Sequence, residues 1–272
     1  MTADSSAAVA VLIMVLVSVL DEWAEWAIAP FSVIMPAMTA PHPIPGWYGK
    51  LPTLGDFASR RLEPGFITPW DAWLAEGIAG LRAQAEDAWL AHYLASPVWR
   101  FVLMPGVIGL DTAMAGVLMP SVDRVGRYFP LTLAAPLGTV PQSMAQVDDL
   151  QAWLHQLDDT AADALHEDWS VDQLEAELER LPMNTPHSAP CAALSALGEV
   201  IQGRQPHATL PLPSRHHLSI LLELSAATQW QTAAQGLAFW WAESAEGAPR
   251  SLVSRGLPRG DGFAALLGSA AA

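Results

Sequence analysis

The sequence predicts a single α/β domain in which helices cover a sheet, and two observations support this fold class. Short apolar runs that suit buried strands alternate along the chain with segments whose apolar residues recur at helical spacing. Hydrophobic residues make up 51% of the 272 residues and charged residues only 15%. A chain of this length and composition can bury a sizeable core.

Six runs have the length and composition of strands. They cover residues 46–52, 98–104, 113–119, 129–135, 218–224 and 237–241. The first ends in a turn marked by Pro52 and Gly55, because both residue types interrupt regular structure.

Helices are predicted between these runs. Thr68-Pro69-Trp70 has a capping residue followed by proline, which is typical of a helix start, and apolar residues recur from Trp70 to Leu81. Ser170 and Gln173 fit a capping box for a helix that ends near Leu181. The remaining predicted helices cover 86–94, 144–166, 191–202 and 261–267.

The first 45 residues differ in composition from the rest. Residues 7–20 are an apolar run, shorter than the about 20 residues of a membrane-spanning helix. A signal peptide is disfavoured because no Lys or Arg precedes Lys50. A weak membrane anchor, a partner-docking segment and an over-extended start, with Met35 or Met38 as the true start, remain open. We favour a start near Met38 and a folded domain over 46–268.

Charge and cysteine content exclude several classes of function. Thirteen Lys and Arg against 28 Asp and Glu give a formal net charge of −15, which argues against a nucleic-acid partner and an anionic membrane surface. The single cysteine, Cys191, excludes a disulfide framework and a cysteine-based zinc cluster. A reducing compartment follows as the expectation. The 12 tryptophans predict large buried anchors or an interaction surface.

Motifs for catalysis are missing from the sequence. It contains no G-x-S-x-G, H-E-x-x-H, Walker loop or G-x-G-x-x-G. Cys191, near His166 and His187, fits a core position better than a thiol nucleophile. His155, Asp159, Asp163 and His166 share one helix face as a metal candidate, but a single helix cannot wrap one ion with ligands spread over three turns. We expect a solvated face there, and neither cofactor nor metal.

Two polar clusters interrupt apolar surroundings. One covers 55–61, with Asp71 in the following helix, and the other covers 120–130. Their arginines could grip an anionic group or form ion pairs with Asp56, Asp71 and Asp123 that fix loops, and the second role is favoured. A third segment, 148–179, holds 11 acidic residues and no Lys or Arg. It predicts a solvated helical face or a docking face for a basic partner.

Five segments in order resemble the TagF (ImpM) family of type VI secretion accessory proteins. They are GWYGKLPTLGDFASRRL, FITPWDAWL, SPVWRFVL, AGVLMPSVDRVGRYFPLTLAAP and FWWAESAEGAPRSLVSRGLP, the last followed by FAALL. The resemblance runs from about Gly46 to Leu267 and leaves residues 1–40 outside.

The resemblance implies a three-layer α/β/α sandwich, which we expect as one domain with a mixed central sheet. It also implies a cytoplasmic, non-catalytic, post-translational repressor that engages the forkhead-associated scaffold protein of the secretion system. The family's signature positions, with roles in loop fixation or partner binding, are Lys50, Asp56, Arg60, Arg61, Asp71, Trp99, Arg100, Asp123, Arg124, Arg127 and Tyr128. The alternatives are a hydrolase or phosphatase-like enzyme using His and Asp groups, and a weakly membrane-associated secretion component.

Overall fold

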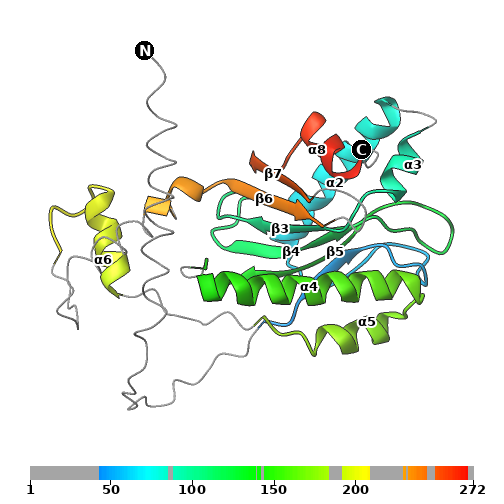
Figure 1. The fold of residues 1–272 in the computed structure, drawn as a ribbon, viewed down its shortest axis with the longest axis horizontal. Helices are drawn as coiled ribbons and strands as arrows, with labels where there is room; N and C mark the ends of the chain where they lie inside the picture. Colours follow the sequence, from blue (N-terminus) through cyan, green and yellow to red (C-terminus); the bar gives the residue numbers. More distant parts are fainter. Residues whose placement is uncertain are drawn as a thin grey trace. The chain divides into compact units, whose positions relative to one another are not determined.

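A seven-stranded antiparallel sheet forms the centre of the domain (Figure 1). The computed structural model describes residues 43–84, 88–138, 140–141, 144–183, 192–208, 229–230, 232–243 and 249–268. The strands are β1 (Gly46–Gly49), β2 (Ala58–Arg60), β3 (Trp99–Leu103), β4 (Ala113–Met119), β5 (Leu131–Leu137), β6 (Leu237–Ala242) and β7 (Arg250–Arg255). Their order in the sheet is β2-β1-β5-β4-β3-β6-β7.

The expected mixed sheet is corrected, because every pair of neighbouring strands in the described part is antiparallel. Loops without helices join β3 to β4 and β4 to β5. Such direct connections return the chain alongside the strand it has just left, whereas parallel neighbours need a long crossover.

Helices cover both faces, which confirms the α/β/α layering (Figure 1). Helices α2 (Pro64–Gln84), α3 (Trp89–Leu94) and α8 (Asp261–Leu267) contribute to the hydrophobic cluster on one face. Helices α4 (Met144–His166) and α5 (Val171–Leu178) contribute to the cluster on the other. A further helix, α6 (Ala192–Ile201), agrees with the predicted helix 191–202.

Tryptophans fill the layer between α2 and the sheet. Trp70 lies at the centre, with ring centroids 4.8 Å from Trp73 and 5.1 Å from Phe101. The Trp70 indole donates to Thr132 Oγ1 at 2.9 Å, and the Trp73 indole donates to the Pro258 carbonyl at 2.6 Å. These rings are therefore the buried anchors that the tryptophan content predicted, and their N–H groups hold the layers in register.

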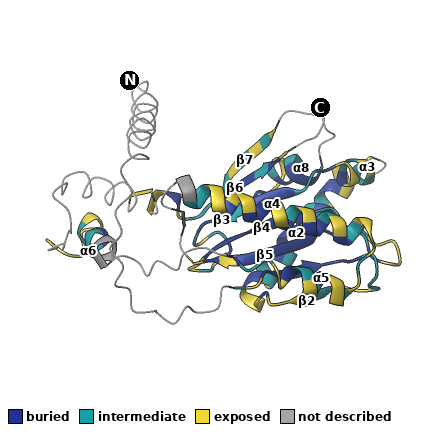
Figure 2. Cartoon of the chain, turned by 60° about the horizontal axis from the view of Figure 1, so that its bottom comes forward, coloured by how far each residue is buried: buried dark blue, intermediate teal, exposed yellow. Residues whose placement is uncertain are grey.

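Helix α4 closes the other face with the apolar stripe that its sequence predicted. Leu154, Leu157 and Ala161 are fully buried and pack with strand residues such as Val117 and Leu133. Figure 2, turned toward this face, shows exposed residues along the outer sides of α4 and α5 and buried strands behind them. The polar face of α4 is thus solvent-facing.

Several predicted boundaries move. Helix α2 begins at Pro64 rather than near Thr68, and the Glu63 carbonyl accepts hydrogen bonds from the Phe66 and Ile67 amides. Proline suits that first position because no intrahelical partner is needed there. The capping box of α5 is confirmed, although the helix ends at Leu178. Strands β2 and β7 were not predicted, and the predicted strand 218–224 lies outside the described residues.

Within the described ranges, no helix is both long and apolar enough to cross a membrane. The apolar run 7–20 lies outside them.

Two glycines of α2 test how closely the helix packs. A Cβ on Gly77 would lie 2.3 Å from the Phe263 ring of α8, whereas one on Gly80 meets nothing within 4 Å. Gly77→Ala should therefore destabilise the protein by about 1–3 kcal/mol through overpacking. Gly80→Ala, the matched control, should stabilise it by about 0.5–1 kcal/mol because alanine favours helix. Urea unfolding of both variants measures the difference, and equal effects would contradict the close packing of α8 on Gly77.

Candidate interaction site

The two polar clusters of the sequence meet at one end of the sheet. Strand β5 pairs with both β1 and β4 in antiparallel fashion, so that β1 and β4 end where β5 begins. Residues 50–57, which follow β1, and residues 120–130, which follow β4, therefore emerge side by side. We call these two segments the loop pair.

A buried ion pair joins the two loops. Lys50 Nζ donates to Asp123 Oδ2 at 2.8 Å, and the exposed fractions of the two side chains are 3% and 0%. Asp123 also accepts from the Val125 amide at 3.0 Å, the Arg127 amide at 2.8 Å and Arg127 Nε at 2.7 Å. Burial alone would raise the pKa of the Asp123 carboxyl, but the bonds from Lys50 and Arg127 outweigh it and hold that pKa well below its usual range.

Further hydrogen bonds fasten the loop pair. The Arg124 amide donates to the Leu54 carbonyl at 2.9 Å, and Ser121 Oγ donates to the Lys50 carbonyl at 2.7 Å. Arg127 Nη2 donates to the Gly55 carbonyl. Backbone groups of both loops are thus occupied by one another, which fixes the side chains they carry.

An aromatic cluster lies beside the ion pair. Lys50 Nζ lies 4.8 Å from the centroid of the Phe57 ring, a cation–π distance. The Phe57 ring in turn lies 4.8 Å from Phe129 and 6.1 Å from Tyr48. The Tyr48 hydroxyl donates to Asp71, and burial together with this carboxylate raises the pKa of Tyr48 far above its ordinary value. Asp71 therefore anchors the base of the cluster.

Five side chains of the loop pair are exposed: Asp56 and Arg127, which pair with each other, and Phe57, Arg124 and Val125. Phe57 is 43% exposed and Val125 64% exposed, and Arg124 is also exposed. Arg124 makes no ion pair with any residue in the described part of the chain, whereas Arg127 reaches Asp56 at 3.8 Å in addition to Asp123. We call Phe57, Arg124 and Val125 the loop-pair surface.

Arg61 finds a partner that sequence reasoning missed. Its Nη1 pairs with Glu175 of α5, and its Nε donates to the Pro45 carbonyl at 2.9 Å. Trp47 Nε1 also donates to Glu175 at 2.6 Å. Burial raises the pKa of the Glu175 carboxyl, but the hydrogen bonds from Arg61 and Trp47 lower it by more. The pKa of Glu175 therefore lies below its ordinary value. The neighbouring Arg60 is exposed and donates only to the Ser59 carbonyl at 2.8 Å in the described structure.

Three signature residues lie away from the loop-pair surface. Trp99 is buried and donates to the Leu266 carbonyl at 2.7 Å. Arg100 points to the α4 face, where it pairs with Asp158 at 2.6 Å and with Glu243 at 2.9 Å. Burial raises the pKa of Asp158 despite Arg100 beside it. Tyr128 packs edge-on against the rings of Trp89 and Tyr93.

The metal candidate does not form a cluster. His155 Nδ1 lies 2.9 Å from Arg100 Nη2, and no group of three or more His, Cys, Asp or Glu side chains in the described ranges is arranged to hold an ion. An arginine nitrogen can only donate, so Nδ1 acts as the acceptor in this contact. Cys191 and His187 lie outside the described residues.

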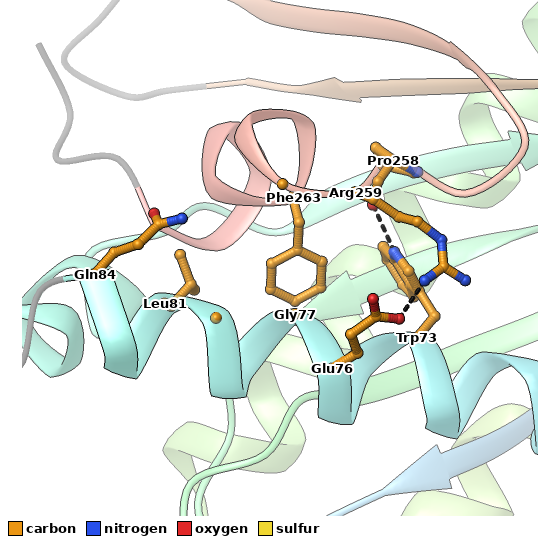
Figure 3. A pocket seen from close by; sticks show the side chains of 10 residues that line it. Trp73, Glu76, Gly77, Leu81, Gln84, Pro258, Arg259 and Phe263 are labelled. Carbon is orange, nitrogen blue, oxygen red and sulfur yellow. Dashed lines mark hydrogen bonds and ion pairs between the residues drawn. The ribbon is translucent and has the colours of Figure 1, made fainter.

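A small groove separates α2 from the segment that leads into α8 (Figure 3). Its cavity volume is about 200 Å³. Trp73, Gly77 and Phe263 form its apolar floor, and the Arg259–Glu76 ion pair lies at its rim. Gly80 also lines the groove, and a Cβ there would meet nothing within 4 Å. No local sequence pattern predicts this groove, since Trp73 and Pro258 on its two sides are 185 positions apart.

The fold and the loop pair together define a class of domain: a three-layer α/β/α domain that presents an apolar and basic surface on fixed loops. The profile of the TagF N-terminal domain, type VI secretion system-associated, matches residues 46–181. The crystal structure of PA0076 from Pseudomonas aeruginosa PAO1 is similar at 33% identity with a TM-score of 0.61, over 83% of this chain and 94% of that chain. No curated protein matches significantly.

The chain therefore belongs to the TagF family, and its role is that of an accessory protein of type VI secretion.

Removal of the buried cation should be costly. Lys50→Met leaves the Asp123 carboxylate buried without its lysine, and loss of one partner of a buried ion pair costs about 3–5 kcal/mol. Arg180→Met is the matched control, because Arg180 pairs with Glu177 on the surface of α5 and such pairs contribute about 0–1 kcal/mol. Denaturant unfolding of both variants checks this, and equal losses would show that the loop pair does not depend on Lys50.

The low pKa of Asp123 predicts a pH dependence. A carboxyl whose pKa is lowered by folding stabilises the protein above its unfolded pKa of about 3.9, and this contribution falls as pH drops through and below that value. Asp123→Asn should be less stable at pH 7 and lose less stability between pH 5 and pH 2.5 than the wild type. The exposed Asp149→Asn controls for the loss of one charge. Parallel pH profiles of wild type and Asp123→Asn would exclude this role.

Proposed function

We propose that this protein is a non-catalytic, cytoplasmic repressor of type VI secretion that binds the forkhead-associated scaffold protein of the secretion system through its loop-pair surface. Membership of the TagF family supports the secretion context. The observation that carries the choice of surface is the solvent-facing Phe57 and Val125 beside Arg124 on loops that a buried ion pair fixes. Aromatic and arginine side chains supply much of the energy of protein interfaces.

The fixed base of this surface favours binding. Side chains that are already ordered lose little conformational freedom when a partner docks, so that more of the contact energy appears as affinity. Repression then follows from mass action, because a scaffold molecule held by this protein is withheld from assembly until it is released.

The two arginines of the turn have different roles in this proposal. Arg127 binds Asp123 and the Gly55 carbonyl, so it holds the loops together. The side chain of Arg124 has no ion pair in the described structure and is available to a partner. A charge reversal at Arg127 would test loop integrity, and a reversal at Arg124 tests recognition.

Binding can be measured with the full chain and the forkhead-associated scaffold from the same secretion cluster, in phosphorylated and unphosphorylated forms. We expect saturable binding by the wild type that is weakened at least about tenfold, or 1.4 kcal/mol, by Arg124→Glu. Val125→Ser should weaken it less, because it removes only apolar contact. Both variants should keep the melting temperature of the wild type.

Arg180→Glu on α5 is the control for charge, since it makes the same change of charge at another exposed site. Wild-type affinity in Arg124→Glu and Val125→Ser would exclude the loop-pair surface as the contact. Absence of binding by the wild type to either scaffold form would exclude the mechanism and leave the family assignment unaffected.

A further inference from the structure

We propose that the outer edge of β7 is a second binding surface, which takes up an extended, acidic segment of a partner protein as an added strand. Strand β7 (Arg250–Arg255) is the last strand of the described sheet and pairs only with β6 (Figure 1). An open edge of this kind offers unpaired backbone donors and acceptors to another chain.

The direction of the backbone groups follows from the neighbouring strands. The Met104 amide donates to the Leu237 carbonyl, so Leu237 directs its backbone toward β3. The backbone N–H and C=O groups of successive residues in an antiparallel strand point alternately to the two neighbouring strands. The N–H and C=O groups of Ala238 and Trp240 therefore point toward β7, where these residues pair with Ser254 and Leu252.

The alternation continues along β7. The Gly256 amide donates to the Gly236 carbonyl at 2.7 Å, so every second residue, Leu252, Ser254 and Gly256, points its backbone groups toward β6. Ser251, Val253 and Arg255 therefore direct their N–H and C=O groups away from β6. No backbone hydrogen bond within the described ranges engages these outward groups.

The other edge of the sheet is protected, which makes β7 distinctive. Strand β2 has only three residues, and Arg61 directly after it has a positive φ of 60° that ends the extended backbone. Strand β7 has six residues with no proline, bulge or inward-pointing charge to disfavour pairing.

The side chains beside this edge are apolar and accessible. Val253 is 61% exposed and lies opposite Phe239 of β6. Trp230 is 50% exposed, and its ring lies 6.1 Å from that of Phe239. An added strand would place every second side chain against this strip, because side chains alternate between the faces of a sheet.

Charge identifies the occupant. Strand β7 itself contains two arginines and no acidic residue, in a chain with a net charge of −15. Arg259 pairs with Glu76 and Arg250 donates to the Ala265 carbonyl, whereas Arg255 is exposed and donates only a 3.3 Å bond to the Gln235 carbonyl. The same edge of a second copy would bring another Arg255 to this one, whereas an acidic segment complements Arg255.

The β7 edge is separate from the loop-pair surface. The loop pair follows β1 and β4, and strands β3 and β6 separate β4 from β7 in the sheet. The two surfaces therefore share no residue, and the proposal for β7 does not depend on the proposed scaffold contact.

The test uses a fluorescein-labelled octapeptide that contains glutamate, valine and threonine, titrated with the full chain by fluorescence anisotropy. We expect saturable binding, and at least tenfold weaker binding of the same peptide with lysine in place of glutamate. Val253→Pro should reduce binding at least tenfold, because it removes an outward N–H while the bonds to β6 come from its neighbours. Val253→Ala keeps that N–H and should reduce binding less.

Arg255→Glu tests charge without a change of backbone, and it should invert the preference so that the lysine peptide binds more tightly. Circular dichroism and melting curves check that the variants fold; if Val253→Pro does not, the inverted preference of Arg255→Glu decides. Equal binding of both peptides by the wild type would overturn the proposal, as would wild-type binding by folded Val253→Pro. A dimer of the free chain that Val253→Pro dissociates would assign the edge to a second copy and overturn the acidic occupant.

Discussion

The buried ion pair between Lys50 and Asp123 is the interaction on which the candidate site depends. Lys50 is the only lysine of the chain, and it lies in the interior. A buried pair of this kind is stable only when hydrogen bonds compensate both charges for the loss of water. Here Asp123 receives bonds from Lys50, from Arg127 and from two backbone amides, so the carboxylate stays charged and organises the turn that follows β4. That turn therefore determines where the solvent-facing side chains beside it lie.

The tryptophan layer has a comparable role in the body of the domain. Large rings bury much apolar surface, but each indole N–H needs an acceptor when it leaves water. Trp70, Trp73 and Trp99 find these acceptors on β5, on the segment before α8 and on α8 itself. Each bond joins residues at least 62 positions apart, so that the same side chains that drive burial also specify which elements pack together. The same tryptophans therefore supply both the apolar core and the polar contacts that fix how its layers pack.

The sequence allowed the main elements to be predicted, and the failures have physical causes. The apolar stripe of α4 and the apolar runs of β3, β4 and β6 are strong local signals, because buried positions require apolar side chains. Strand β2 has three residues and β7 alternates polar with apolar at an edge, so neither forms a continuous apolar run. Ion-pair partners are a matter of tertiary structure: Lys50–Asp123 and Arg61–Glu175 each join distant segments. The clusters were therefore predictable, and the partners of their arginines were not.

The acidic segment 148–179 shows how the same charges can serve the interior and the surface. Asp158 holds Arg100 beneath α4, and Glu175 holds Arg61 beside β1, so both carboxylates attach the helical layer to the sheet. Glu177 pairs only with Arg180 in the described structure, on the outer side of α5. A long acidic stretch thus contributes fewer free charges than its count indicates. Arg124 on the loop pair and Arg255 on β7 are among the exposed arginines that make no ion pair in the described structure, against this negative background. The net negative charge repels an acidic partner unless its contacts concentrate on exposed arginines such as these.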